Sequence, residues 1–344
     1  MRWEKTASLN IGLDFAILKG RLTGAFDYYH KKGTDLLTTT DLDPTTGWRN
    51  LTINNGELSN TGIELQLNGE ILQARNRQQI GISAAFGIAY NQNEVTAVNH
   101  EPTTGMEALY YGTFHQGYPV HSLFSYRFAG MDEKKAIQYF GWYDHNDEVH
   151  FTDLDSEEFT PQDVVYSGSL DPKVSMSFTP TLTWQGFTLS AMFAYYGGHV
   201  MRARMEDWTY DGSANGYRAL PLLEHLPAVP ASYLNYWTQE NYLDYPANGY
   251  AGSTNVVGDF QHLDANVLPA DYLKLRNVVL GYEFSKSVCR LLHVQSLRLR
   301  AQINNLWTWT RNDKDIDPEA TNPFSGESSL RTPRSYTLSL NVNF

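Results

Sequence analysis

The 344-residue sequence contains one cysteine, Cys289, which excludes an intramolecular disulfide and a metal cluster held by several cysteines. Basic residues are also scarce, with 26 Lys and Arg against 38 Asp and Glu, and the net charge of −12 argues against a nucleic-acid partner. No stretch approaches the roughly 18 consecutive apolar residues of a membrane-spanning helix. That absence leaves open a membrane β-barrel, whose short strands alternate apolar with polar residues.

Sequence signatures of catalysis are missing as well. The chain has no GxSxG, HExxH, phosphate-binding loop or Cys-x-x-Cys motif, and its 10 His residues lack the spacing of metal ligands. We therefore expect no enzyme activity, no metal and no other cofactor. Residues Met1 to Lys5 show no apolar run or small-residue cleavage site, so we expect no signal peptide in this sequence.

What the sequence does contain is alternation, together with 13% aromatic residues. Side chains in a β-strand point alternately to opposite faces, so apolar residues at every second position indicate a strand with one apolar face. The pattern covers residues 9–17, 22–28, 63–72, 80–90, 174–184, 187–195, 273–284, 297–309 and 336–344. Leu273 and Leu275 are out of phase with Val278 and Leu280, which predicts a β-bulge near Asn277.

The connections between these segments alternate between short and long. The short turns are Lys19-Gly20, Gln73 to Gln78, Gln185-Gly186 and Lys286 to Gln295, and the long loops are 32–60, 91–171, 197–271 and 311–333. Short turns at one end and long loops at the other are typical of outer-membrane barrels. Aromatic residues near segment ends fit the girdles of such barrels, namely Tyr90, Trp184, Tyr195, Trp307, Trp309, Tyr336 and Phe344.

We therefore predict an all-β fold with about nine antiparallel strands of a transmembrane β-barrel. A soluble sandwich also has alternating strands, so the alternative is a soluble all-β carbohydrate-binding module or hydrolase domain. Segments of ten or more residues exceed the usual globular strand of about five or six, which favours the barrel. A hydrolase would also need two convergent carboxylates about 5–10 Å apart, which a sequence does not show.

Several short motifs run in order along nearly the whole chain. They are Trp3-Glu4-Lys5-Thr6 with Asn10-Ile11-Gly12-Leu13-Asp14-Phe15, Asp27-Tyr28-Tyr29 to Asp35-Leu36-Leu37, Asn55-Gly56-Glu57-Leu58 to Asn60-Thr61-Gly62-Ile63-Glu64, Gly117-Tyr118-Pro119, Tyr272-Leu273-Lys274-Leu275-Arg276-Asn277 with Leu280-Gly281-Tyr282, Asn304-Asn305-Leu306-Trp307-Thr308-Trp309-Thr310, and Asp317-Pro318-Glu319. In this order and spacing they resemble the C-terminal barrel of the SusC/RagA-type TonB-dependent outer-membrane transporters.

The resemblance implies that residues 1–344 are the C-terminal part of a larger receptor of about 22 strands, whose plug domain and signal peptide are absent here. Nine strands are too few to close a barrel around a plug, and an open edge in lipid would leave backbone groups unpaired. The implied location is the outer membrane of a Gram-negative bacterium, in contact with its lipid. The implied partners are a SusD-like surface lipoprotein, the TonB energy-transducing complex and an imported oligosaccharide or peptide, most often a glycan.

Three groups of residues are candidates for contacts. Aromatic residues of the loop 197–271 could stack on sugars or grip a peptide, or could form the loop's own small core: Trp208, Tyr210, Tyr217, Tyr236, Trp237, Tyr242 and Tyr245. If Leu297, Leu299, Ala301 and Ile303 face lipid, then Arg298, Arg300, Gln302 and Asn304 face the lumen, because a charge at mid-bilayer costs roughly 2–4 kcal/mol. The resemblance implies that Tyr336, Leu338, Leu340, Val342 and Phe344 are the signal for barrel insertion.

The acidic residues Asp153, Asp155, Glu157 and Glu158 suggest a calcium loop. Such a loop needs glycine at its sixth position and glutamate at its twelfth, where this chain has Glu158 and Val164. We therefore expect a solvated external loop at this position.

Overall fold

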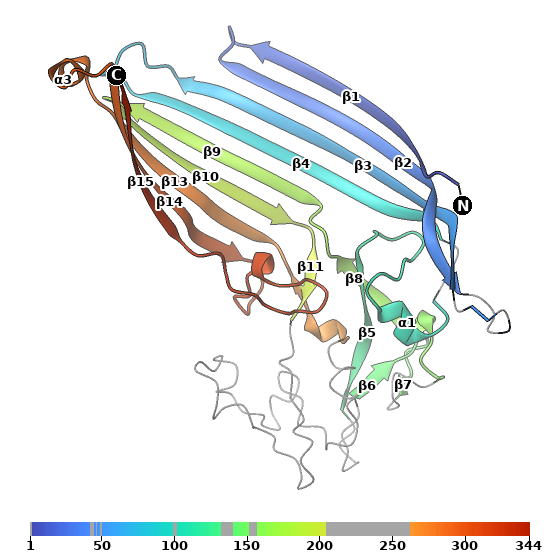
Figure 1. Cartoon of the computed structure of the whole chain (residues 1–344). Coiled ribbons are helices and arrows are strands. Elements are labelled where there is room, and N and C mark those ends of the chain that lie inside the picture. Colours follow the sequence, from blue (N-terminus) through green and yellow to red (C-terminus); the bar gives the residue numbers. More distant parts are fainter. Residues whose placement is uncertain are drawn as a thin grey trace.

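The computed structural model describes residues 2–41, 45, 47–48, 50–98, 102–131, 140–150, 157–203 and 262–344. Within these ranges, the long strands form one 9-stranded antiparallel sheet in the order β1-β2-β3-β4-β9-β10-β13-β14-β15 (Figure 1). They are β1 (Lys5–Ile17), β2 (Leu22–Asp41), β3 (Asn50–Leu72), β4 (Gly81–Ala97), β9 (Val174–Trp184), β10 (Phe187–Gly197), β13 (Tyr272–Glu283), β14 (Ser296–Thr310) and β15 (Ser335–Asn343). Each covers one of the alternating segments to within one residue, so the predicted all-β antiparallel fold is confirmed.

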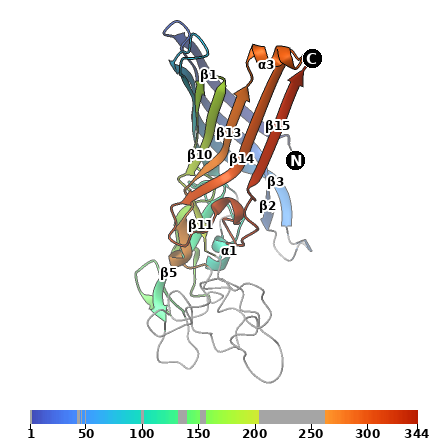
Figure 2. The ribbon, with the colours of Figure 1, turned by 90° about the vertical axis from the view of Figure 1, so that its left-hand side faces the viewer.

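The sheet is curved and open, with β1 and β15 as its two edge strands (Figures 1 and 2). Neighbouring strands of this sheet are also consecutive in the sequence, with two exceptions: β4 pairs with β9, and β10 pairs with β13. The short turns lie at one end of the strands, together with helix α3 (Lys286–Leu291), which occupies one of them. The folded parts of the long connections lie at the other end, as the sequence predicts.

The alternation leaves the apolar face of this sheet uncovered in the described structure. On β1, Leu9, Ile11 and Leu13 are 53%, 57% and 62% exposed, and Leu338 on β15 is 73% exposed. In a soluble sandwich such side chains would be buried against a second sheet. Most buried apolar residues instead lie in the long connections. The described residues therefore do not form the soluble sandwich that we considered as the alternative.

The phase change in β13 is a β-bulge, as predicted. Leu275 pairs with Phe193 of β10 and Asn277 pairs with Met192, which leaves Arg276 without a partner in this ladder. One extra residue shifts the alternation, so that each later side chain of the strand points to the opposite face from the one its position would otherwise give. The apolar residues on both sides of the bulge consequently share one face of the sheet.

Two expected loops contain more regular structure than the sequence indicates. Residues 32–60 are largely strand, because β2 continues to Asp41 and β3 begins at Asn50. The two strands remain paired beyond irregularities of register between Gly33 and Leu37. Backbone hydrogen bonds between adjacent strands need no apolar face, so a polar sequence did not reveal the extension.

Residues 91–171 are the second case, since they contain a small sheet in the order β7-β6-β5-β8. Its strands are β5 (Ser122–Met131), β6 (Phe140–Tyr143), β7 (Val149–His150) and β8 (Val164–Ser169). Helix α1 (Gly105–Leu109) contacts the 3-10 helix η2 (Pro161–Asp163) beside this sheet. Together they enclose a core of Leu109, Phe124, Tyr126, Trp142, Phe159 and Leu263. We name this folded unit the loop domain.

A second small core lies where the connections after β10 and before β13 meet. There, β11 (Val200–Arg202) pairs with β12 (Val267–Pro269), which follows the 3-10 helix η4 (Asp264–Asn266). A last 3-10 helix, η5 (Pro318–Ala320), lies between β14 and β15. No helix in the described ranges combines the length and the apolar character needed to cross a membrane.

Candidate functional site

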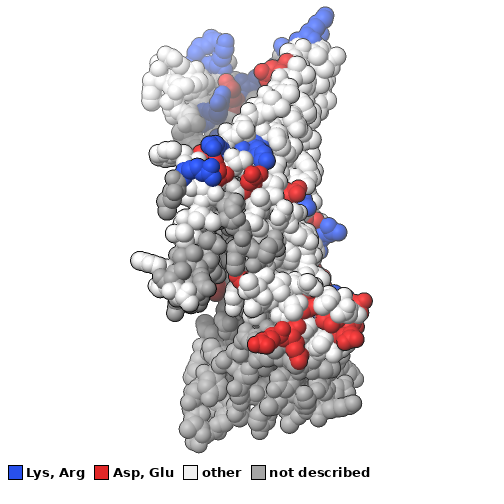
Figure 3. Space-filling model, turned by 90° about the vertical axis from the view of Figure 1, so that its right-hand side faces the viewer, with Lys and Arg blue, Asp and Glu red and all other residues white. Residues whose placement is uncertain are grey.

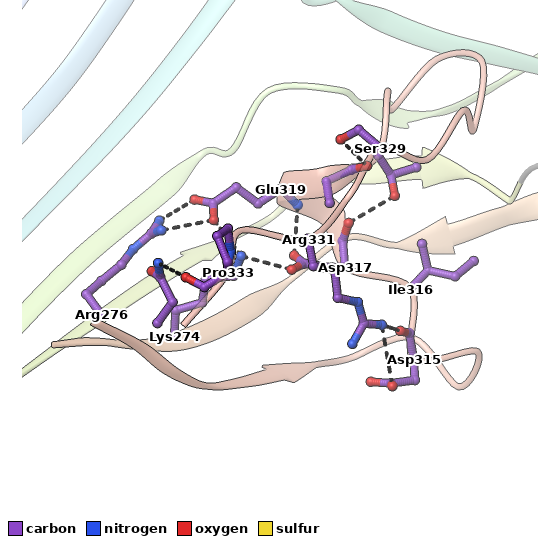
Figure 4. Close-up of polar contacts among 12 residues, drawn as sticks. Lys274, Arg276, Asp315, Ile316, Asp317, Glu319, Ser329, Arg331 and Pro333 are labelled. Carbon is purple, nitrogen blue, oxygen red and sulfur yellow. Dashed lines mark hydrogen bonds and ion pairs between the residues drawn. The ribbon is translucent and has the colours of Figure 1, made fainter. Parts of the chain in front are cut away.

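Two motifs that are far apart in the sequence meet in a cluster of four charges (Figure 4). The ammonium of Lys274 on β13 lies 3.0 Å from Asp317 Oδ2 and also bonds Glu319. Arg276 donates to both carboxylate oxygens of Glu319, with its Nη1 2.9 Å from Oε2. The side chains of Lys274 and Asp317 are only 5% and 6% exposed. We name these four residues the wall anchor, because they tie the connection 311–333 to the wall of the sheet.

Local structure explains how the wall anchor forms. The bulge takes Arg276 out of the regular ladder, and Pro318 opens η5 so that Asp317 and Glu319 lie at its start. Asp317 Oδ1 also accepts the backbone N–H of Glu319 at 3.1 Å. Burial acts to raise the pKa of Glu319, but the hydrogen bonds from Arg276 and Lys274 outweigh it and hold this pKa below its ordinary value. Both motifs belong to the resemblance to SusC/RagA-type receptors, but the sequence alone does not predict that they are in contact.

A buried arginine joins three long connections at the same end of the sheet. The guanidinium of Arg202 on β11 lies 2.6 Å from Nδ1 of His262 and donates to the backbone oxygen of Phe124, also at 2.6 Å. It also lies over the ring of Phe324, 4.9 Å from the centroid. Burial lowers the pKa of Arg202 to about 10. Burial and the nearby Arg202 lower the pKa of His262 to about 3, so this imidazole is neutral and can accept the hydrogen bond.

A cavity of about 250 Å³ lies between the end of β4, the turn at Gly117, the loop domain and the start of β9. Tyr118 and Tyr166 line it with ring centroids 4.9 Å apart. The rest of the lining is mainly polar: Asn91, Gln92, Asn93, Glu94, Gly117, Pro119, Ser169, Asp171, Pro172 and Lys173. Aromatic rings beside amides and carboxylates can stack on a sugar and bond its hydroxyls. We name this cavity the tyrosine pocket.

A second, more open cavity of about 490 Å³ lies on the polar face of β1, β2 and β3. It is lined by Ser8, Asn10, Asp27, Tyr29, Lys31, Asn60 and Glu64. The hydroxyl of Tyr29 donates to Asn91 at 2.9 Å, and Asn91 lines the tyrosine pocket. The two cavities are therefore linked through one hydrogen bond.

The polar residues predicted to face the lumen do share one face of β14. Arg300 donates to Gln302 at 2.9 Å, and Gln302 donates to Asn304 at 2.6 Å. Asn304 continues this ladder to Ser335 at 2.9 Å, and Arg298 lies 3.3 Å from Glu283 on β13. That this face borders the lumen stays a prediction.

The residues predicted as insertion signal lie at the sheet edge. Tyr336, Leu338, Leu340 and Val342 belong to β15, and Phe344 follows its last residue. Tyr336 and Phe344 are 72% and 85% exposed. The predicted contact residues Trp208, Tyr210, Tyr217, Tyr236, Trp237, Tyr242 and Tyr245 lie outside the described residues, as do Asp153 and Asp155.

One group in the loop domain has the donor types of a metal site. Asp144, Glu148 and His150 each offer a ligand atom within 4.8 Å of the others. The Asp144 carboxylate, however, already accepts the backbone N–H groups of Asn146 and Glu148, at 2.9 and 2.8 Å. These bonds are those of a tight turn, and we assign no metal to the group.

Comparison with known proteins finds no matching family model. Over its whole length, however, the chain is 26% identical to TonB-dependent receptor P3 of Formosa agariphila and 24% identical to TonB-dependent receptor SusC of Bacteroides thetaiotaomicron. The aligned parts are 34% and 32% of those proteins, so the chain spans about a third of their length. Both are named as receptors, in agreement with the expectation that this chain is not an enzyme.

Among solved structures, the chain matches the RagAB peptide importer in its "closed-closed" state with a TM-score of 0.71 and 23% identity. The match covers 100% of this chain and 36% of that one. The RagAB peptide transporter gives a TM-score of 0.69, also at 23% identity. The predicted resemblance to SusC/RagA-type receptors is thus confirmed, and the curved sheet corresponds to part of a barrel of this type.

Proposed function

We propose that this chain supplies wall strands and external loops of a TonB-dependent outer-membrane transporter. The observation that carries the proposal is the 9-stranded sheet. No described residues cover its apolar face, while its other face bears a polar ladder. Lipid would cover the first face, and the second would border the lumen with Arg298, Arg300, Gln302 and Asn304. The full-length similarity to TonB-dependent receptors supports the same assignment.

The proposed transporter is larger than this chain. The outer edges of β1 and β15 would pair with further strands of the same receptor, since an unpaired edge is costly in lipid. A plug would fill the completed barrel, and the TonB complex would drive its displacement. A SusD-like surface lipoprotein would bind over the loop domain and the neighbouring connections. In this arrangement the short turns face the periplasm.

We propose an oligomeric nutrient as the substrate, and a glycan as its class. The tyrosine pocket supports this choice, because its two rings lie among amides and carboxylates. The aromatic residues of the loop 197–271, among them Trp208 and Trp237, would add stacking contacts. The RagAB structures carry the name of a peptide transporter, which makes peptide the competing class to test.

The membrane assignment is tested by heat-modifiability on a gel after extraction in mild detergent. A membrane band whose mobility shifts on boiling is expected, and a soluble band near 39.1 kDa that does not shift would refute the assignment.

The substrate class is tested by uptake of labelled oligosaccharides and labelled peptides into cells that carry single variants. Glu94→Gln is suitable because Glu94 lines the tyrosine pocket and is exposed, and because Gln has nearly the same size as Glu. Loss of a hydrogen bond to a charged group is worth roughly 1.5–3 kcal/mol, so glycan affinity should fall about 10- to 100-fold. Tyr110→Ala is the control, since Tyr110 is 56% exposed and lines neither cavity. Peptide uptake that falls while glycan uptake stays unchanged would reverse the assigned class.

A further inference from the structure

The end of the sheet that carries the short turns is basic, although the chain as a whole is acidic. Its turns contribute six exposed cations, Lys19, Arg21, Arg75, Arg77, Lys286 and Arg290. Figure 3 shows Lys and Arg at the tips of this end, at the top of the view, with some Asp and Glu just below them and further Asp and Glu toward the opposite end. We name these six residues the basic rim.

The charges of the basic rim are not neutralised within the described part of the chain. No ion pair joins any of the six residues to a carboxylate there. Arg21 donates to the backbone oxygens of Glu70 and Ile71, and Arg77 donates to that of Glu283. The nearby carboxylate of Glu283 is 3.3 Å from Arg298 instead. The rim thus keeps a net positive charge that can attract an external anion.

Exposed apolar side chains flank the same cations. Leu18 beside Lys19 is 68% exposed, and Ile71 near the turn of Arg75 is 63% exposed. On α3 and just after it, Leu291 and Leu292 are 79% and 53% exposed, next to Arg290. Leucines that enter the acyl boundary, with lysine and arginine heads at phosphate depth, are the usual contacts of a protein with a lipid interface.

We propose that the basic rim binds the anionic head groups of phospholipids in the periplasmic leaflet. This inference rests on the proposed function, because the short turns meet that leaflet only in a membrane barrel. The charge of the rim identifies the lipid class, since a zwitterionic head group has no net charge to offer six cations that form no ion pair within the described residues. Binding there would hold the barrel at a defined depth and orientation.

The experiment reconstitutes the intact receptor in phosphatidylcholine vesicles with trace spin-labelled lipid. Electron paramagnetic resonance gives the fraction of spin label that the protein immobilises, for phosphatidylglycerol and for phosphatidylcholine. We expect phosphatidylglycerol to be preferred severalfold at low salt, and the preference to approach one in 1 M NaCl because salt screens exposed charges. Equal association of the two lipids at low salt would overturn the inference.

Two pairs of substitutions assign the effect to the rim. Lys286→Gln with Arg290→Gln removes two rim charges and keeps α3 helical, because Gln is a good helix former. Lys314→Gln with Arg334→Gln removes the same charge from exposed residues at the opposite end of the sheet. The first pair should lower the preference at least twofold and the second should leave it unchanged.

An equal loss in both pairs would show that net charge alone is responsible, which contradicts a rim site. Arg21 and Arg77 stay unmutated, since their hydrogen bonds hold the turns. Heat-modifiability of each variant checks that the barrel is folded. A wild-type receptor that fails to enter vesicles would refute the proposed function itself, whereas insertion without lipid preference refutes only this inference.

Discussion

Substitution of Lys274 by Met should detach the connection 311–333 from the wall of the sheet. The ammonium of Lys274 is 5% exposed and lies between the carboxylates of Asp317 and Glu319. Removing one partner of a buried ion pair costs roughly 3–5 kcal/mol, because the remaining charge is left buried. Glu319 is 29% exposed and keeps Arg276, so the lower end of that range applies. If the free energy that holds this connection against the sheet falls by about 3 kcal/mol, the population of molecules with the connection detached rises about a hundredfold.

Hydrogen exchange of the protein in detergent measures this opening. The amide of Arg202 on β11 reports on it, because it donates at 2.9 Å to the backbone oxygen of Pro323, which belongs to this connection. Its protection should fall about a hundredfold, while protection in β9 stays unchanged. Arg298→Met is the matched control, since its pair with Glu283 is 61% and 58% exposed and is worth at most about 1 kcal/mol.

A double variant tests the stated cause. Asp317→Asn added to Lys274→Met removes the buried charge but keeps an oxygen that can accept the N–H of Glu319. Most of the lost protection should return, because the cost arises from the uncompensated carboxylate. If Lys274→Met changes protection no more than Arg298→Met, or if the double variant recovers nothing, the reasoning is refuted.

Three further outcomes are expected. His262, which packs against the loop domain, has a pKa of about 3 in the folded protein against an ordinary 6.5. The unfolded state therefore takes up the proton first, and stability falls as the pH drops below 6.5. Between pH 7.5 and 5.5 the loss is about 1.4 kcal/mol, and exchange of the Tyr126 amide, which bonds His262 O, should show a slope that His262→Gln flattens. Gly62→Ala should destabilise the protein by about 1–3 kcal/mol and lower its melting temperature, because the added Cβ would clash with the Tyr29 hydroxyl and lie 2.6 Å from Tyr90 O. An unchanged melting curve would contradict this. Phe344→Ala should reduce the heat-modifiable fraction in membranes without changing the extent of β15. Equal assembly of the wild type and the variant would contradict the assignment of Phe344 to an insertion signal.

The strands were predictable because each produces its own pattern of apolar residues in the sequence. A strand with one apolar face repeats every two residues, so segments such as 187–195 and 297–309 could be located without any knowledge of their neighbours. The bulge in β13 was predictable for the same reason, since one extra residue changes the phase of the pattern. Residues 34–41 were missed because polar strand extensions have no such repeat.

The sequence by itself therefore determined the strands, the bulge, the separation of short turns from long connections and the resemblance to SusC/RagA-type receptors. Only the tertiary structure decided that Lys274 meets Asp317, that Arg202 reaches Phe124 and Phe324, and that the tyrosine pocket forms. Alternation is a local property, because each side chain takes its face from its own backbone. Contacts between residues of distant connections depend on how the folded loops pack, and no local pattern encodes that packing.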